Sequence, residues 1–124
     1  MSAIADTQIL LYAALSPNMN VYVDEASEGA VSPYVVIGNT TMTNDSTKNR
    51  SGEDFTVTIH VWHETSGYGA KQLLAEVKQA LSSLTMDGFN LWLSNVEYMD
   101  VLTDPSGWKH GILRIRMRIQ EGVN

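Results

Sequence analysis

The chain has 124 residues, of which 44% are hydrophobic and 18% are charged, a composition typical of a single globular domain over residues 1–124. The absence of cysteine excludes disulfides, thiolate metal sites and cysteine nucleophiles. The net charge of −6 argues against a nucleic-acid-binding protein, and no apolar run approaches the roughly 18 residues that cross a membrane. Because the N-terminus also lacks the basic start of a signal peptide, the sequence predicts a soluble, cytoplasmic protein.

Acidic residues are concentrated in the first half of the chain. Residues 1–64 hold eight carboxylates against two cations, whereas residues 65–124 hold six of each. This asymmetry predicts an acidic face, although an ordinary solvated surface is the alternative explanation.

The first 43 residues predict one helix followed by two strands. Within residues 3–15 the apolar side chains fall into one helical stripe, formed by Ile4, Leu11 and Leu15 and widened by Ile9, Leu10 and Tyr12. Residues 21–23 are typical of a short strand, and residues 24–32 of an acidic loop. The β-branched and aromatic run 34–37, continued through 40–43, predicts a longer strand.

The clearest strand pattern covers residues 55–63. Its odd-numbered residues, Phe55, Val57, Ile59, Val61 and His63, are expected on one face, and its even-numbered residues on the other. Between this strand and the preceding one lies the polar segment 44–52, which has no core-forming residue. We therefore expect a long hairpin with a mobile tip.

The second half predicts one amphipathic helix and two strands. In residues 66–84 apolar side chains repeat at three and four residues and line one face: Leu73, Leu74, Val77, Leu81 and Leu84. A less clearly patterned strand over 89–103 is followed by an Asp-Pro-Ser-Gly turn at 104–107 and a last strand over 108–120.

The resulting element order is α-β-β-β-α-β-β. Hairpin-connected strands around one main amphipathic helix predict the α+β class. We expect a mostly antiparallel sheet with the main helix and the N-terminal helix packed on it.

Candidate catalytic and metal-binding motifs fail on spacing. His60 and His63 lie three residues apart in a strand, so their side chains point to opposite faces. The segment 67–69, Gly-Tyr-Gly, lacks the third glycine and the Lys-Ser/Thr pair of a phosphate loop. His110 has no partner that the sequence reveals. Without a recognisable nucleophile, base and orienting group, the sequence predicts no enzyme, no cofactor and no metal.

Three arginines share one face of the last strand: Arg114, Arg116 and Arg118. Like charges on one sheet face destabilise it, so acidic partners are expected. One alternative is a cross-strand partner such as Glu97 or Asp100 in the same subunit. The other is a head-to-tail contact with the acidic first half of a neighbouring copy, which closes into a ring where the rotation permits.

Four segments together resemble a known family. They are SPYVVIG at 32–38, FTVTIHVW at 55–62, GAKQLLAEVKQAL at 69–81 and HGILRIRMRI at 110–119. With the opening helix and the short strand, they resemble the tail completion (tail terminator) proteins of long-tailed bacteriophages and of phage-derived gene transfer agents. The resemblance covers most of the chain, and its most specific part is the Pro-Tyr-Val-Val-Ile-Gly strand with its spacing to the Val-Trp strand end and the following helix.

The resemblance implies a structural virion protein without a cofactor. Relatives form a homohexameric ring on the head-proximal end of the tail tube, at the tail–neck junction, after synthesis in the host cytoplasm. The implied partners are other copies of the chain, the tail tube protein and the head–tail connector protein, while DNA passes through without specific binding. A head–tail connector or stopper protein is the first alternative. A small enzymatic or ligand-binding domain, with the loop 24–28 and His60 lining a pocket, is the second.

Two surfaces follow from this interpretation. The expected subunit contact joins the arginine row to the acidic first half, namely Arg114, Arg116, Arg118, Asp24, Glu25 and Glu28. The expected docking hairpin for the tube or connector is Asn44, Asp45, Ser46, Thr47, Lys48, Asn49, Arg50 and Ser51.

Overall fold

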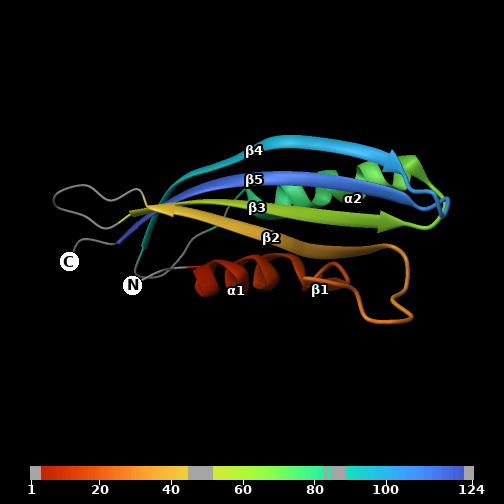
Figure 1. Cartoon of the computed structure of the whole chain (residues 1–124), viewed down its shortest axis with the longest axis horizontal. Coiled ribbons are helices and arrows are strands. Elements are labelled where there is room, and N and C mark those ends of the chain that lie inside the picture. Colours follow the sequence, from red (N-terminus) through yellow and green to blue (C-terminus); the bar gives the residue numbers. More distant parts are fainter. Residues whose placement is uncertain (1–3, 45–51, 83, 85–88, 122–124) are drawn as a thin grey trace.

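The computed structural model describes residues 4–44, 52–82, 84 and 89–121, and Figure 1 shows how their elements are arranged. In chain order these elements are α1 (Ile4–Leu15), β1 (Val21–Val23), β2 (Tyr34–Asn44), β3 (Gly52–His63), α2 (Gly67–Leu81), β4 (Phe89–Thr103) and β5 (Lys109–Glu121). The predicted order of elements and the α+β class are confirmed.

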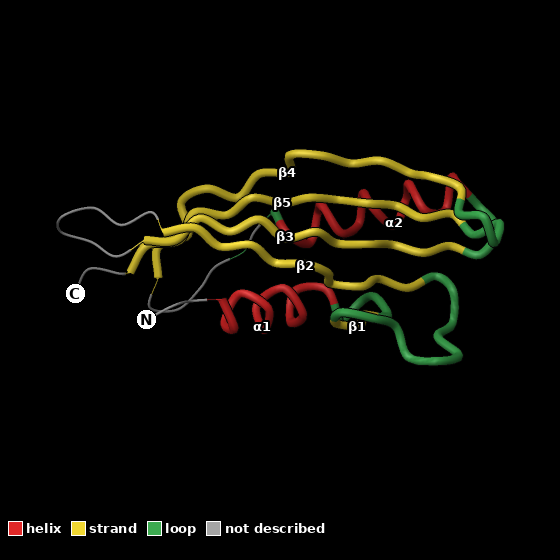
Figure 2. Tube along the Cα trace, viewed as in Figure 1, coloured by secondary structure: helices red, strands yellow, loops and turns green. Residues whose placement is uncertain are grey.

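The described strands form a five-stranded sheet in the order β1-β2-β3-β5-β4. The pair β1–β2 is parallel, whereas β2–β3, β3–β5 and β5–β4 are antiparallel. Because β5 returns between β3 and β4, those two strands run in the same direction, and α2 connects them. β1 and β4 are therefore the two edges of the sheet, and Figure 2 shows α1 near the first edge and β4 at the opposite one.

The core lies between the helices and one face of the sheet. The odd-numbered residues of β3 from 55 to 61 and of β5 from 113 to 119 are buried there, as their alternation predicts. The helical contribution comes from α2, through Leu73, Leu74, Val77 and Leu81, and from Leu11 and Leu15 of α1. The opposite face of the sheet carries neither of the two described helices, and we call it the open face.

Local hydrogen bonds fix the start of α2. Ser66 is the N-cap residue, and its hydroxyl accepts a hydrogen bond from the Gly69 N–H at 2.8 Å. His63 Nδ1 accepts from the Ser66 N–H at 3.0 Å. A Cβ at position 69 would lie 2.6 Å from the His63 ring, so glycine is needed there. The helix ends at Leu81, three residues earlier than predicted, but Leu84 still packs against the core.

The predicted apolar stripe of α1 is wrong in part. Leu11 and Leu15 are buried with Thr7, but Ile4, Ile9 and Tyr12 are 42%, 66% and 45% exposed. Apolar residues surround this helix on nearly all sides, and only one side packs against β2 and α2. Its sequence therefore could not indicate which side is covered.

Two strands contain bulges. In β2 the register shifts between Ile37 and Thr40, where Gly38 and Asn39 stand opposite a single residue of β3. In β4 the register shifts between Leu91 and Leu93 and again between Val96 and Tyr98. Each bulge moves later residues to the other face, which explains why the sequence pattern of β4 is less clear.

Among the described residues, no helix combines the length and apolar character needed to cross a membrane.

Candidate functional site

The open face of the sheet carries the three arginines of β5. Residues 113, 115, 117 and 119 of this strand are buried against the helices, whereas Arg114 is exposed and Arg116 and Arg118 are half-buried. The predicted division of β5 into a core face and an arginine face is therefore confirmed. The environments of the three cations nevertheless differ.

Arg116 is neutralised inside the subunit by Asp54 of β3. The Arg116 Nε donates to Asp54 Oδ1 at 3.0 Å, and its Nη2 donates to Oδ2 at 2.6 Å, which makes the contact bidentate. This hydrogen-bonded guanidinium holds the pKa of Asp54 below its usual value, and the charge of Arg118 acts in the same direction. For Arg116 the structure thus provides the cross-strand partner that was one of the two alternatives.

The identity of that partner was not predicted. Asp54 lies directly across from Arg118 and diagonally from Arg116 in the β3–β5 register. Of the two candidates suggested by the sequence, Asp100 instead accepts hydrogen bonds from the Tyr98 hydroxyl at 3.0 Å and from the Val101 N–H at 2.8 Å. Recognising Asp54 required the register of two strands that are far apart in the sequence.

Arg114 has no such neutralising contact. Its side chain is exposed opposite Tyr98 of β4 and, within the described part of the chain, makes no hydrogen bond or ion pair. The acidic residues Asp24, Glu25 and Glu28 are also exposed, in the loop between β1 and β2. That loop follows the edge strand β1, and Arg114 lies near the opposite edge, so one subunit does not bring them together. A contact between copies stays a prediction.

The open face also holds a histidine pair that the sequence did not reveal. His60 Nδ1 lies 2.8 Å from His110 Nε2, and the His110 ring stacks on Trp62 with ring centroids 4.0 Å apart. Burial is the main cause that lowers the pKa of both histidines. The expectation that His110 has no partner is therefore wrong, while His60 and His63 do point to opposite faces.

Further rings extend this cluster toward the β1 edge. Tyr34 contacts Tyr22 edge-on at 5.8 Å between centroids and lies 6.0 Å from Trp108. The aromatic residues come from β1, β2, β3 and the start of β5, so no single sequence motif contains them. The available sequence signal was the alternation within β3, which places residues 60 and 62 on the same face.

These groups do not form a recognisable catalytic centre. Across the described ranges, no three His, Asp or Glu side chains gather as a metal site would require. For a ligand-binding domain, the sequence predicted a pocket lined by the Asp24–Glu28 loop and His60. None of the three hollows of the described structure that follow is lined by these residues.

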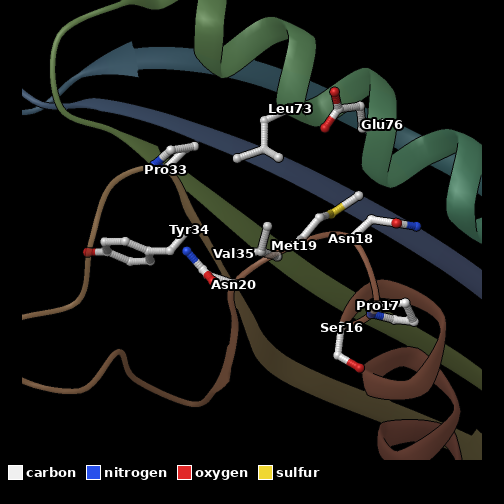
Figure 3. A pocket seen from close by; sticks show the side chains of 10 residues that line it. All are labelled: Ser16, Pro17, Asn18, Met19, Asn20, Pro33, Tyr34, Val35, Leu73 and Glu76. Atoms are coloured by element: carbon white, nitrogen blue, oxygen red, sulfur yellow. The ribbon is translucent and has the colours of Figure 1, made fainter.

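A groove of about 330 Å³ opens between the α1–β1 turn, the start of β2 and α2 (Figure 3). Its polar groups come from Ser16, Asn18, Asn20 and Glu76, beside the apolar side chains of Met19 and Leu73. A hollow of about 510 Å³ continues along α2 from the shared residues. The single carboxylate has no base or nucleophile paired with it in the described structure, so the arrangement indicates no reaction.

A third hollow, of about 260 Å³, lies between α2 and β4. It is lined by Lys71, Leu74, Met99, Asp100 and Val101. Three of these side chains are apolar, and the other two carry one charge of each sign. The predicted docking hairpin lies largely outside the described residues, because of its members the structure describes Asn44 but not 45–51.

Comparison with known proteins connects this fold to one family. A family model described as "Tail completion protein gp17" matches residues 5–120. The tail completion protein gp17 of Bacillus phage SPP1 is 32% identical over 111 residues, which cover 87% of this chain and 83% of that protein. The solved structure of SPP1 gp17 has a TM-score of 0.60 at 28% identity and covers 98% of this chain and 89% of that one.

A chain from the virion of a native gene transfer agent particle has the same fold. Its TM-score is 0.81 at 20% identity, over 97% of this chain and 99% of that chain. The family match spans both helices and nearly all of each described strand. The chain therefore belongs to the tail completion protein gp17 family.

Proposed function

We propose that this chain forms a homohexameric ring that caps the head-proximal end of a tail tube, stops tube polymerisation and joins the tail to the head. In this role it is a virion component at the tail–neck junction, assembled in the cytoplasm of the host cell. It works through protein contacts, without catalysis and without a cofactor.

The 32% identity to the SPP1 tail completion protein over 87% of the chain is the observation that carries this proposal. The likeness in fold to a chain of a gene transfer agent virion supports it further. A ring also needs a surface on each side of the subunit, and both lateral sides expose apolar side chains, on α1 and on β4.

DNA would pass through the ring without being held. The chain carries a net charge of −6, and six copies carry six times that charge, which repels phosphate wherever it faces the channel. The described cations lie on α2 and β5, while residues 4–44 contain none. The proposed partners are therefore proteins, namely the tail tube protein and the head–tail connector protein.

For docking we propose the hairpin tip, Asn44 to Ser51. Deleting residues 45–51 and closing β2 to β3 with a short glycine linker should impair tail docking more than folding. Equal binding of the tube protein by the deletion variant and the parent chain would remove this role from the hairpin.

Electron microscopy with mass measurement tests the ring directly. We expect six-fold rings with an open centre from the purified protein at high concentration, or at the ends of tail tubes. A pull-down with tube protein and with connector protein in parallel then separates two roles. Preferential capture of the tube protein supports a terminator, whereas preferential capture of the connector makes the chain a neck protein instead. A monomer that binds neither protein contradicts the proposal.

A further inference from the structure

The outer side of α1 is apolar although no part of the described chain covers it. Ala5, Ile9, Tyr12 and Ala13 share this side, and all four are exposed. The buried side of the same helix is formed by Thr7, Leu11 and Leu15. A helix that is apolar on both sides is normally packed on both sides.

The opposite lateral edge of the molecule also exposes apolar side chains, beside the polar Asn95, Glu97 and Thr103. Tyr98, Met99 and Leu102 of β4 are 45–48% exposed. β4 is an edge strand of 15 residues, so the hydrogen-bonding groups along its outer side have no strand to pair with in the described sheet. Beside it lies the hollow of about 260 Å³ between α2 and β4.

The two patches cannot meet within one chain. β1 and β4 are the two ends of the sheet order, and Figure 1 shows α1 and β4 on opposite sides of the molecule. A second copy displaced sideways, with its strands in the same orientation, brings the β4 edge of one copy to α1 of the next. Such a head-to-tail contact repeats around a ring.

The charges favour this arrangement over a two-fold one. The acidic loop with Asp24, Glu25 and Glu28 adjoins the α1 side, and Lys109 and the exposed Arg114 adjoin the β4 edge. In Figure 1 the loop and the end of β4 lie at the same end of the long axis. The β4 edge also carries Glu97 and Asp100, so head-to-tail packing sets the carboxylates of one copy against an edge with charges of both signs. A two-fold contact of the α1 sides instead sets carboxylates against carboxylates, because residues 4–44 contain no Lys or Arg.

We propose that each copy docks the outer side of α1 on the β4 edge of the next copy, with Tyr12 entering the hollow between α2 and β4. This inference rests on the proposed ring. Leu74, Met99 and Val101 give the hollow an apolar lining that suits the tyrosine ring, and the charged side chain of Lys71 in the same lining suits its hydroxyl. The occupant is thus a second copy of this chain.

Cysteine cross-linking tests the contact cleanly, because the chain has no cysteine of its own. Ile9→Cys and Met99→Cys are made as separate proteins and together in one chain. In rings or on tube ends, a mixture of the two single variants should form a cross-linked dimer, and the double variant should form a ladder up to the closed ring. Each single variant alone should not cross-link.

A matched pair of truncations gives a second measurement. Tyr12→Ala should raise the concentration needed for assembly about tenfold or more, because it empties the hollow. Tyr68→Ala, at an exposed tyrosine of α2 that does not line the hollow, should leave assembly unchanged. Cross-linking of Ile9→Cys to itself, or equal effects of the two truncations, would overturn the contact.

The failure of this contact differs from the failure of the proposed function. Rings that form and cap tubes without the 9–99 cross-link would refute these surfaces and leave the function intact. The absence of any assembly, in solution and on tubes, would refute the ring and this contact together.

Discussion

Arg116 of β5 and Asp54 of β3 form a bidentate ion pair on the open face of the sheet, although they are 62 residues apart in the chain. The pair joins the strand that follows the polar hairpin to the strand that ends the fold. It also neutralises the central cation of the arginine row.

Asp54→Asn and Arg116→Gln should each lower the free energy of unfolding by about 1 kcal/mol, because the pair is partly exposed. The double variant should lose less than the sum of the two single losses, since the interaction is counted once. Urea unfolding of all four proteins measures this coupling. Strict additivity of the two losses would show that the pair contributes nothing to stability.

The same pair predicts acid sensitivity below about pH 4. The pKa of Asp54 is lower in the folded chain than its ordinary value of 3.8, so the stabilisation of the fold by the Asp54–Arg116 pair is complete above pH 3.8. This stabilisation is lost as the pH falls through the lower pKa that Asp54 has in the folded chain. Asp54→Asn should flatten this part of the stability curve and leave the curve above pH 5 parallel to that of the parent chain.

The histidine pair predicts a separate effect at higher pH. His60 and His110 have folded pKa values below their ordinary value of 6.5, mainly because both are buried, although Asp104 partly opposes the shift at His110. The unfolded chain therefore binds more protons below pH 6.5, and stability should fall as the pH decreases from 7.5 to 5.5. Replacing both residues by glutamine should reduce this slope, as measured by thermal unfolding. An unchanged slope would assign the pH dependence to other groups.

Gly111, in β5, should not tolerate a larger side chain. A Cβ at this position would collide with Val61 and approach Leu74 to 3.1 Å, where α2 packs on the sheet. Gly111→Ala should cost roughly 1–3 kcal/mol of unfolding free energy, as overpacking of a core does. Gly67→Ala is the control, because a Cβ there has no atom within 4 Å. Equal denaturation midpoints for the two variants would contradict the predicted clash.

Charge reversal beside the β4 edge should weaken assembly, and a compensating charge reversal on the acidic loop should restore it. Arg114→Glu should raise the concentration needed for assembly about tenfold, because in the proposed contact Arg114 faces the acidic loop of the next copy. Adding Glu25→Lys and Glu28→Lys to the same chain should restore assembly to within about threefold. Lys78→Glu, on α2 away from this edge, should have little effect, and light scattering against concentration compares them. A triple variant as weak as Arg114→Glu alone would refute the pairing.

The sequence predicted the elements that carry a simple period. β3, β5 and α2 each bury one face against a common core, so alternation or helical spacing identified their buried residues. Their limits were less accurate, because β3 begins at Gly52, three residues before the predicted start, and α2 ends three residues before the predicted end. The turn between β4 and β5 was equally clear from Asp104 to Gly107, where Asp104 accepts hydrogen bonds from Ser106.

What sequence reasoning missed depends on contacts between distant segments. The insertion of β5 between β3 and β4 brings His110 to His60 and Arg116 to Asp54, and local patterns contain no record of that order. The exposed side of α1 was missed for a different reason. Its apolar residues suit two packed sides, and one of those sides faces away from its own chain.

Cryo-electron microscopy of tail tubes polymerised with and without this chain tests directly whether the chain caps a tail tube. We expect tubes grown with the chain to stop elongating and to carry a six-fold ring of it at one end. Tubes that keep growing with bare ends, or that bind the chain along their sides, would contradict a role in capping the tail.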